Sequence, residues 1–166
     1  METITHNLIA ILIQILCFKF FTFPINIILT IIFSFFSHVF FDAISVITYH
    51  TTEKIVEDKF WKWWHIVIYG LSILSLILFI IPFWLSLFFA NVMDLWDWFI
   101  YRPIQKKKLQ VKTGQYPGGK LYFHIIVDWF RDTFFSWLPR WNYKKGGIII
   151  EIVMIVVVSG LIFVVI

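Results

Sequence analysis

The amino-acid sequence predicts an all-α, polytopic integral membrane protein with about five transmembrane helices and one interfacial amphipathic helix. Of its 166 residues, 60% are hydrophobic and only 14% are charged, and the mean hydropathy is +0.85. A soluble domain of this size cannot hide so much apolar surface, because small domains expose a large share of their area. The apolar residues also form runs that can cross a bilayer core of about 30 Å at about 1.5 Å per residue.

The first two apolar runs predict two spans that are separated by Pro24. Residues 4–23 form the first span, and residues 25–49 form the second. The first run lacks a basic region before it and a small-residue cleavage site after it, so we expect a retained helix and not a secretory signal. The single cysteine, Cys17, excludes an intrachain disulfide and a cysteine-based zinc site.

Residues 63–101 form an apolar stretch that is too long for a single span. As one α-helix they would reach about 58 Å at about 1.5 Å per residue, which exceeds the thickness of a bilayer. Pro82 is the helix breaker near the middle, so we expect a tight hairpin between helices at residues 62–80 and 83–101. The basic segment at residues 102–120 contains Gly and Pro and predicts an exposed loop.

The rest of the chain predicts one helix on the membrane surface and one last span. Residues 121–138 place five polar side chains in one sector of a helix that is otherwise rich in Phe, Trp, Ile and Val: His124, Asp128, Arg131, Asp132 and Ser136. Such a helix is too polar for a span and too apolar for water, so an interfacial position fits best. Residues 148–166 form the final span, and the chain is expected to be a single transmembrane domain.

The distribution of Lys and Arg predicts the orientation of these spans. With the N-terminus inside, thirteen of the fourteen basic residues lie on the same side of the membrane, and only Lys19 lies on the other. The positive-inside rule therefore places the N-terminus and the basic loops in the cytoplasm and the C-terminus outside the plasma membrane. Membrane lipids are the expected partners, a nucleic acid partner is not expected, and the oligomeric state is left open.

A stripe of polar residues follows one face of the second predicted span. At about 100° per residue its members fall within an arc of about 80°: Ser34, His38, Asp42, Ser45 and Tyr49. An intramembrane His and Asp one turn apart indicate a functional site by default. The alternative is a hydrogen-bonded pair that only holds two helices together.

Asp94 and Asp97 lie in the fourth predicted span, at a depth similar to that of Asp42. Two desolvated carboxylates repel each other when both are ionised, so one must be protonated or a cation must lie between them. Carboxylates and imidazoles suit a divalent metal, with zinc preferred and manganese, iron or magnesium as alternatives. We therefore predict a metal site to which three pairs of residues can contribute ligands: His38 with Asp42, Asp94 with Asp97, and His124 with Asp128.

His124 and Asp128 share the polar sector of the predicted surface helix. Because this helix is expected at the same leaflet as the metal site, its two residues can complete the coordination or position the attacking water. The predicted catalytic residues are accordingly Asp97, His124 and Asp128.

Two segments of the sequence resemble motifs of a known family. SHVFFDAISVITYH resembles the SHxxxDxxT motif of the membrane-bound metal-dependent hydrolases, and NVMDLWDW resembles their acidic DxDH element. ITHNL, around His6, is similar to an early His segment of that family. Trp98 stands where the family has His, and the motifs occur in a different order. The resemblance implies a metal-dependent hydrolase site that contains His38, Asp42, Asp94 and Asp97.

Two classes of function follow from these features. The first is metal-assisted hydrolysis of an amphiphilic ester or phosphate, such as a phospholipid or a lipid-linked phosphate, at the cytoplasmic leaflet. No GxSxG segment is present, which argues against a serine lipase. The second class is a non-enzymatic membrane protein, either a scaffold or a cation or proton pathway, in which the His and Asp pairs are structural.

Overall fold

A computed structural model describes residues 1–49, 58–113 and 123–166, and every regular element within these ranges is helical. The α-helices are α1 (Thr3–Phe20), α2 (Ile25–Ile44), α3 (Lys59–Asp94), α4 (Arg102–Thr113), α5 (His124–Phe134) and α6 (Gly147–Val165). A short 3-10 turn, η1 (Ser45–Ile47), follows α2, and a π-helical segment, η2 (Leu95–Tyr101), joins α3 to α4. The predicted all-α class is confirmed. Among the described residues, four helical stretches are long and apolar enough to cross a membrane: Thr3–Phe20, Ile25–Ile47, Lys59–Gln105 and Gly147–Val165.

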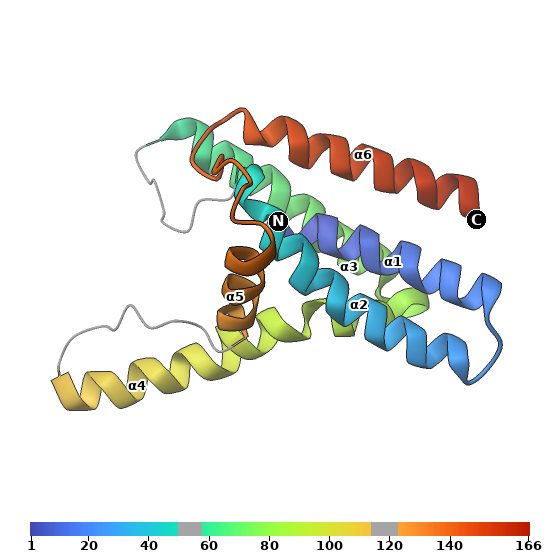
Figure 1. The fold of residues 1–166 in the computed structure, drawn as a ribbon, viewed down its shortest axis with the longest axis horizontal. Helices are drawn as coiled ribbons and strands as arrows, with labels where there is room; N and C mark the ends of the chain where they lie inside the picture. Colours follow the sequence, from blue (N-terminus) through green and yellow to red (C-terminus); the bar gives the residue numbers. More distant parts are fainter. Residues whose placement is uncertain (50–57, 114–122) are drawn as a thin grey trace.

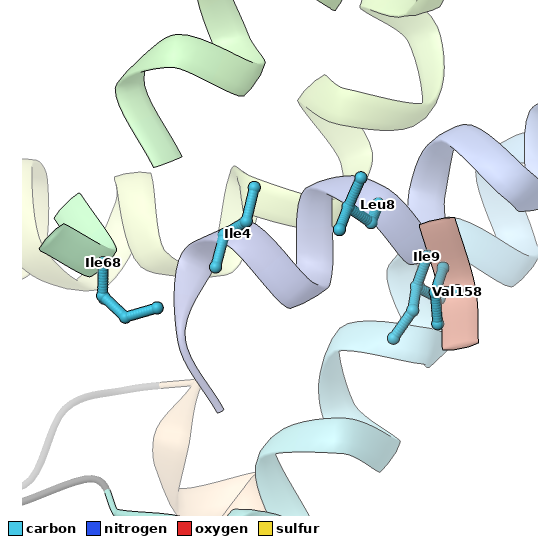
Figure 2. Close-up of a cluster of buried hydrophobic side chains, with 5 residues drawn as sticks. All are labelled: Ile4, Leu8, Ile9, Ile68 and Val158. Atoms are coloured by element: carbon cyan, nitrogen blue, oxygen red, sulfur yellow. The ribbon is translucent and has the colours of Figure 1, made fainter. Parts of the chain in front are cut away.

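Helix α1 is the most buried of these stretches and contacts α2, α3 and α6 (Figure 1). Its apolar side chains belong to a cluster formed with Ile68 of α3 and Val158 of α6 (Figure 2). The α1 members of this cluster are Ile4, Leu8 and Ile9, which recur at helical spacing. Packing around α1 therefore organises the bundle, whereas the other helices keep large apolar faces exposed.

Helix α3 folds back on itself at Phe83, one residue after Pro82. The backbone of Phe83 leaves the helical region, with φ −122° and ψ 25°. Asn7 of α1 contacts both arms, because its amide donates to Ser75 Oγ at 2.8 Å and accepts from Asn91 Nδ2 at 2.8 Å. In a straight helix Ser75 and Asn91 would be about 24 Å apart at about 1.5 Å per residue. The two arms of α3 therefore run back along α1, and the reversal lies beside the proline at which we expect a hairpin.

Gln14 of α1 bridges the break in α3. Its Nε2 donates to the Pro82 carbonyl at 3.1 Å, and its Oε1 accepts from the Ser86 backbone N–H at 3.1 Å. In an unbroken α-helix the Ser86 N–H would donate directly to the Pro82 carbonyl. One side-chain amide thus satisfies both backbone groups in apolar surroundings, where unpaired backbone groups are costly.

The second arm of α3 continues through η2 into α4, which extends away from the rest of the bundle (Figure 1). This corrects the expectation of a loop over residues 102–120, since residues 102–113 are helical and residues 114–120 lie outside the described ranges. The segment is rich in Lys and Gln, which have good helix propensity. Its proline, Pro103, lies in the first turn, where proline is tolerated.

Helix α5 crosses the end of the bundle and packs against α2 (Figure 1). It is shorter than the predicted helix 121–138, because Phe135 leaves the helical region with φ −124° and ψ 18°. Val127, its buried residue, packs in a second apolar cluster with Val39 of α2 and Met93 of α3. This packing holds the start of α5 next to the ends of α2 and α3.

The start of α6 passes very close to the segment that follows α2. A Cβ atom on Gly147 would lie 2.6 Å from the backbone nitrogen of Tyr49, so a residue with a side chain does not fit there. Glu151, one turn further along α6, is fully buried and accepts hydrogen bonds from the Thr5 hydroxyl and the Glu2 N–H. Its carboxylate thereby caps the start of α1, whose first N–H groups have no partner within the helix.

Candidate metal centre

Four ionisable side chains from three helices converge at one end of the bundle. They are His38 and Asp42 of α2, Asp94 of α3 and His124 of α5, and we call them the ligand group. Each offers one ligand atom, and these four atoms all lie within 4.8 Å of one another. His38 and Asp42 are four residues apart and therefore share a face of α2. The reversal at Phe83 returns Asp94 to this end of the bundle, and α5 adds His124.

The separations between the ligand atoms fit the coordination sphere of a single metal ion. His38 Nε2 lies 3.2 Å from Asp42 Oδ2 and 3.8 Å from Asp94 Oδ1. His124 Nε2 lies 3.7 Å from the same Asp42 oxygen and 3.5 Å from the same Asp94 oxygen. Ligand atoms about 2.1 Å from a tetrahedral zinc ion are about 3.4 Å from each other, and the four His–Asp separations are close to that value. Two imidazoles and two carboxylates also form a donor set that zinc, manganese and iron accept.

His38 is fully buried; its Nδ1 has no hydrogen-bond partner among the described residues, and its Nε2 faces the carboxylate oxygens of Asp42 and Asp94. Buried polar atoms nearly always have such a partner, so this side chain requires an explanation. Its Nε2 belongs to the ligand group, where a metal ion would satisfy it. The His6 ring stacks on the His38 ring with 4.4 Å between the centroids. His6 therefore lies directly against a member of the ligand group.

The two oxygens of Asp42 face different partners. Oδ2 belongs to the ligand group, whereas Oδ1 lies 2.9 Å from His6 Nε2 and 2.9 Å from the Met1 amino group. Burial lowers the pKa of that amino group, but the nearby carboxylates of Asp42 and Glu151 outweigh burial and raise the pKa above its ordinary value. Oδ1 is thus held by two donors, and Oδ2 remains available for a metal.

Asp97 lies behind His124 and not among the ligand atoms. Its fully buried carboxylate accepts from His124 Nδ1 at 2.8 Å and from the backbone N–H groups of Phe123 and His124 at 2.9 and 3.0 Å. The sequence suggested a metal ligand and a catalytic residue at this position, and the structure places a supporting carboxylate there. Such carboxylates orient metal-binding imidazoles and fix their tautomer. Asp97 belongs to η2, and π-helical turns occur frequently at functional sites.

Asp128 lies outside the ligand group. Its side chain is 44% exposed and contacts Arg131 Nη2 at 2.7 Å on the outer surface of α5. The sequence grouped it with His124 because residues four apart share a helix face. His124 is the first residue of α5, however, and its ring is drawn toward Asp97. The structure therefore brings His124 into the site without Asp128.

His6 contacts Asp42 of the ligand group, and in the sequence only the resemblance of ITHNL connects it with the site. A stronger signal lies in the topology, because α1 and α2 form a hairpin around the turn before Ile25. His6 and Asp42 lie at nearly equal distances along the chain from this turn. Residues so placed in an antiparallel helix pair meet at the same level, which accounts for the contact between them.

The ligand group is open on one side. The His38 side chain is 0% exposed, whereas the Asp94 and His124 side chains are 31% and 26% exposed. A water molecule or a substrate group can therefore approach the ligand atoms from the side of Asp94 and His124.

Comparisons of the chain with models of protein families, with curated protein sequences and with solved structures find no match.

Proposed function

We propose that the protein is an integral membrane, metal-dependent hydrolase that acts on an ester or phosphate of an amphiphilic, lipid-like substrate. The observation that carries this proposal is the convergence of two imidazoles and two carboxylates from three helices at separations that suit one divalent ion. The long apolar helices support insertion in the plasma membrane. The positive-inside rule supports a cytoplasmic location for the N-terminus and the ligand group.

We assign His38, Asp42 and His124 as the metal ligands, with zinc as the preferred ion. Catalytic zinc sites have three protein ligands and one open position, whereas structural zinc sites have four protein ligands. Asp94 is the most exposed member of the ligand group, with 31% of its side chain exposed, and it lies on the open side of the group. Asp94 is therefore assigned as the general base beside the open position.

A divalent ion held by His38, Asp42 and His124 would lower the pKa of a bound water molecule and polarise a carbonyl or phosphoryl oxygen. Asp94 accepts the proton of the attacking water and returns it to the leaving alcohol oxygen. One bond forms from the water oxygen to the carbonyl carbon or phosphorus, and the bond to the leaving oxygen breaks, so the reaction needs no further reactant. His6 and Asp97 act as positioning residues for Asp42 and His124.

Metal analysis of the detergent-purified protein, combined with turnover of long-chain esters and phosphates in mixed micelles, tests this function. We expect a nearly stoichiometric content of zinc, manganese or iron. Asp42→Asn should lose both metal and turnover, because it removes a ligand. Asp94→Asn should keep the metal and lose turnover, because it removes only the base. Asp128→Asn is the matched control and should retain both.

The competing function is a scaffold in which the four side chains only join helices. If Asp94→Asn loses the metal together with the other variants, the site has four protein ligands and no open position, as structural sites do. A purified protein that holds no metal and gains no thermal stability on metal addition would leave only the scaffold. A cation or proton pathway is less well supported, because the turn between α1 and α2, at the opposite end, exposes mainly aromatic residues: Phe18, Phe20, Phe21 and Phe23.

A further inference from the structure

An apolar cavity of about 510 Å³ lies between α2, the end of α3 and α5. All the residues that line it are hydrophobic, and they include Phe35, Val39, Phe40, Met93, Ile126 and Phe130. The cavity has the size of a small-molecule site, which is typically about 300–1,000 Å³. It has no charged side chain with which to bind a polar head group.

The cavity is lined by near neighbours of the ligand group on all three elements. On each element a lining residue lies next to, or two positions from, a member of the ligand group: Val39 beside His38, Met93 beside Asp94, and Ile126 near His124. Val39 and Met93 are buried and pack in one cluster, so they form the inner wall. A molecule in the cavity would therefore lie immediately beside the candidate metal centre.

The cavity runs along α2 from Val39 to Phe35 and Phe36 and opens on the outer surface of the bundle. Phe35 and Phe36 lie about one helical turn, roughly 5 Å, further than Val39 from the C-terminal end of α2. At the opening, Phe36 and Trp129 are 61% and 62% exposed. In a membrane-spanning bundle this surface faces hydrocarbon, so a lipid can enter from the side.

We infer that this cavity holds one acyl chain of the substrate lipid while the ester or phosphate of that lipid lies at the ligand group, an inference that rests on the proposed hydrolase function. Burying a polar head group in this cavity would cost free energy, because the lining offers it no hydrogen-bond partner. Burying a hydrocarbon chain there has no such cost. An acyl chain that moves from the bilayer into the cavity exchanges one apolar environment for another, so the transfer carries little cost in solvation. The cavity therefore selects chains by their fit and positions the bond to be cleaved.

Photolabelling tests the cavity independently of hydrolysis. The probe is palmitic acid with a diazirine near the end of its chain, added to the protein in phosphatidylcholine nanodiscs. We expect labelled peptides from α2 around Phe35 and from α5 around Trp129. Val39→Trp narrows the cavity and should lower this labelling about tenfold, the effect of a small misfit in an apolar pocket. Ile126→Trp fills the exposed opening without changing the buried core and should act in the same way.

Val156→Trp is the matched control, because it also replaces a valine by tryptophan. Val156 belongs to α6, is 63% exposed and lies outside the cavity. Its labelling should equal that of the parent.

In the hydrolysis assay, Val39→Trp should lower the ratio of palmitoyl to acetyl ester turnover about tenfold. Labelling that neither cavity variant changes would overturn the acyl site even if esters are cleaved. Labelling confined to the cavity without hydrolysis of any ester would retain the acyl site and overturn the hydrolase.

Discussion

The Nδ1 atom of His124 lies 2.8 Å from Oδ2 of Asp97, whose side chain is completely buried. The same carboxylate accepts the N–H groups of Phe123 and His124. It therefore joins the start of α5 to η2 at the end of the second arm of α3. Because a metal-binding imidazole needs a defined tautomer and a fixed ring orientation, this contact decides whether His124 Nε2 can act as a ligand.

Asp97→Asn should weaken zinc binding about 10- to 100-fold, the usual effect of losing a supporting carboxylate. Asparagine does not offer two negatively charged oxygens to His124 Nδ1 and the two backbone N–H groups. The measurement is competition with a zinc chelator in detergent solution. Asp128→Asn removes an exposed carboxylate on the same helix as His124 and should bind zinc like the parent. Equal affinities for the two variants would exclude Asp97 from the site.

Zinc should stabilise the folded protein through the ligand group. A ligand at 100 times its dissociation constant stabilises the native state by about 2.7 kcal/mol if it does not bind the unfolded chain. We expect a corresponding rise in melting temperature for the parent and none for His38→Gln. His65→Gln is the control, because His65 is also buried but bonds the Trp61 carbonyl within α3. A similar rise in His38→Gln would place the zinc elsewhere.

Gln14→Leu should lower the free energy of unfolding by about 1–3 kcal/mol, the cost of leaving buried polar groups unpaired. The Pro82 carbonyl and the Ser86 N–H would both lose their partner at the break in α3. Denaturation in mixed micelles, followed by circular dichroism, measures this loss. Gln105→Leu makes the same change in α4 and should have little effect. Equal stability of the two variants would show that the bridge is dispensable.

Gly147→Ala should destabilise the protein by about 1–3 kcal/mol, because the new Cβ overpacks the backbone of Tyr49. Gly160→Ala, in the same helix, places its Cβ where no described atom lies within 4 Å. Alanine has the higher helix propensity, so this control should be neutral or more stable by up to about 1 kcal/mol. Thermal unfolding of the two variants checks the difference, and a stable Gly147→Ala variant would contradict the close approach of α6 to residue 49.

Reporter fusions test the proposed orientation. A reporter after Lys112 should be cytoplasmic and a reporter at Ile166 should be external, because the basic residues collect on one side. The end of α4 and the C-terminus lie at opposite ends of the structure (Figure 1). Reporters found on the same side would remove the five-span arrangement.

The sequence is most informative where a single helix is concerned. The long apolar runs predict helices, since only such helices satisfy their backbone groups in hydrocarbon. The charges and glycines of residues 102–120 predict a loop, but residues 102–113 continue the helix that precedes them. A polar segment attached to an existing helix needs no new nucleation, so its helix propensity is sufficient.

The sequence by itself determined that His38 and Asp42 share a face of one helix, because the helical period fixes the relative directions of residues four apart. It also determined that Asp94 and Asp97 are close to each other. Only the tertiary structure decided that Asp94 joins the ligand group while Asp97 supports His124, and that His6 holds Asp42. The physical reason is that helical periodicity relates side chains within one helix. The rotation of each helix against its neighbours is set by packing, here by α1 at the centre and by α5 across the end of the bundle.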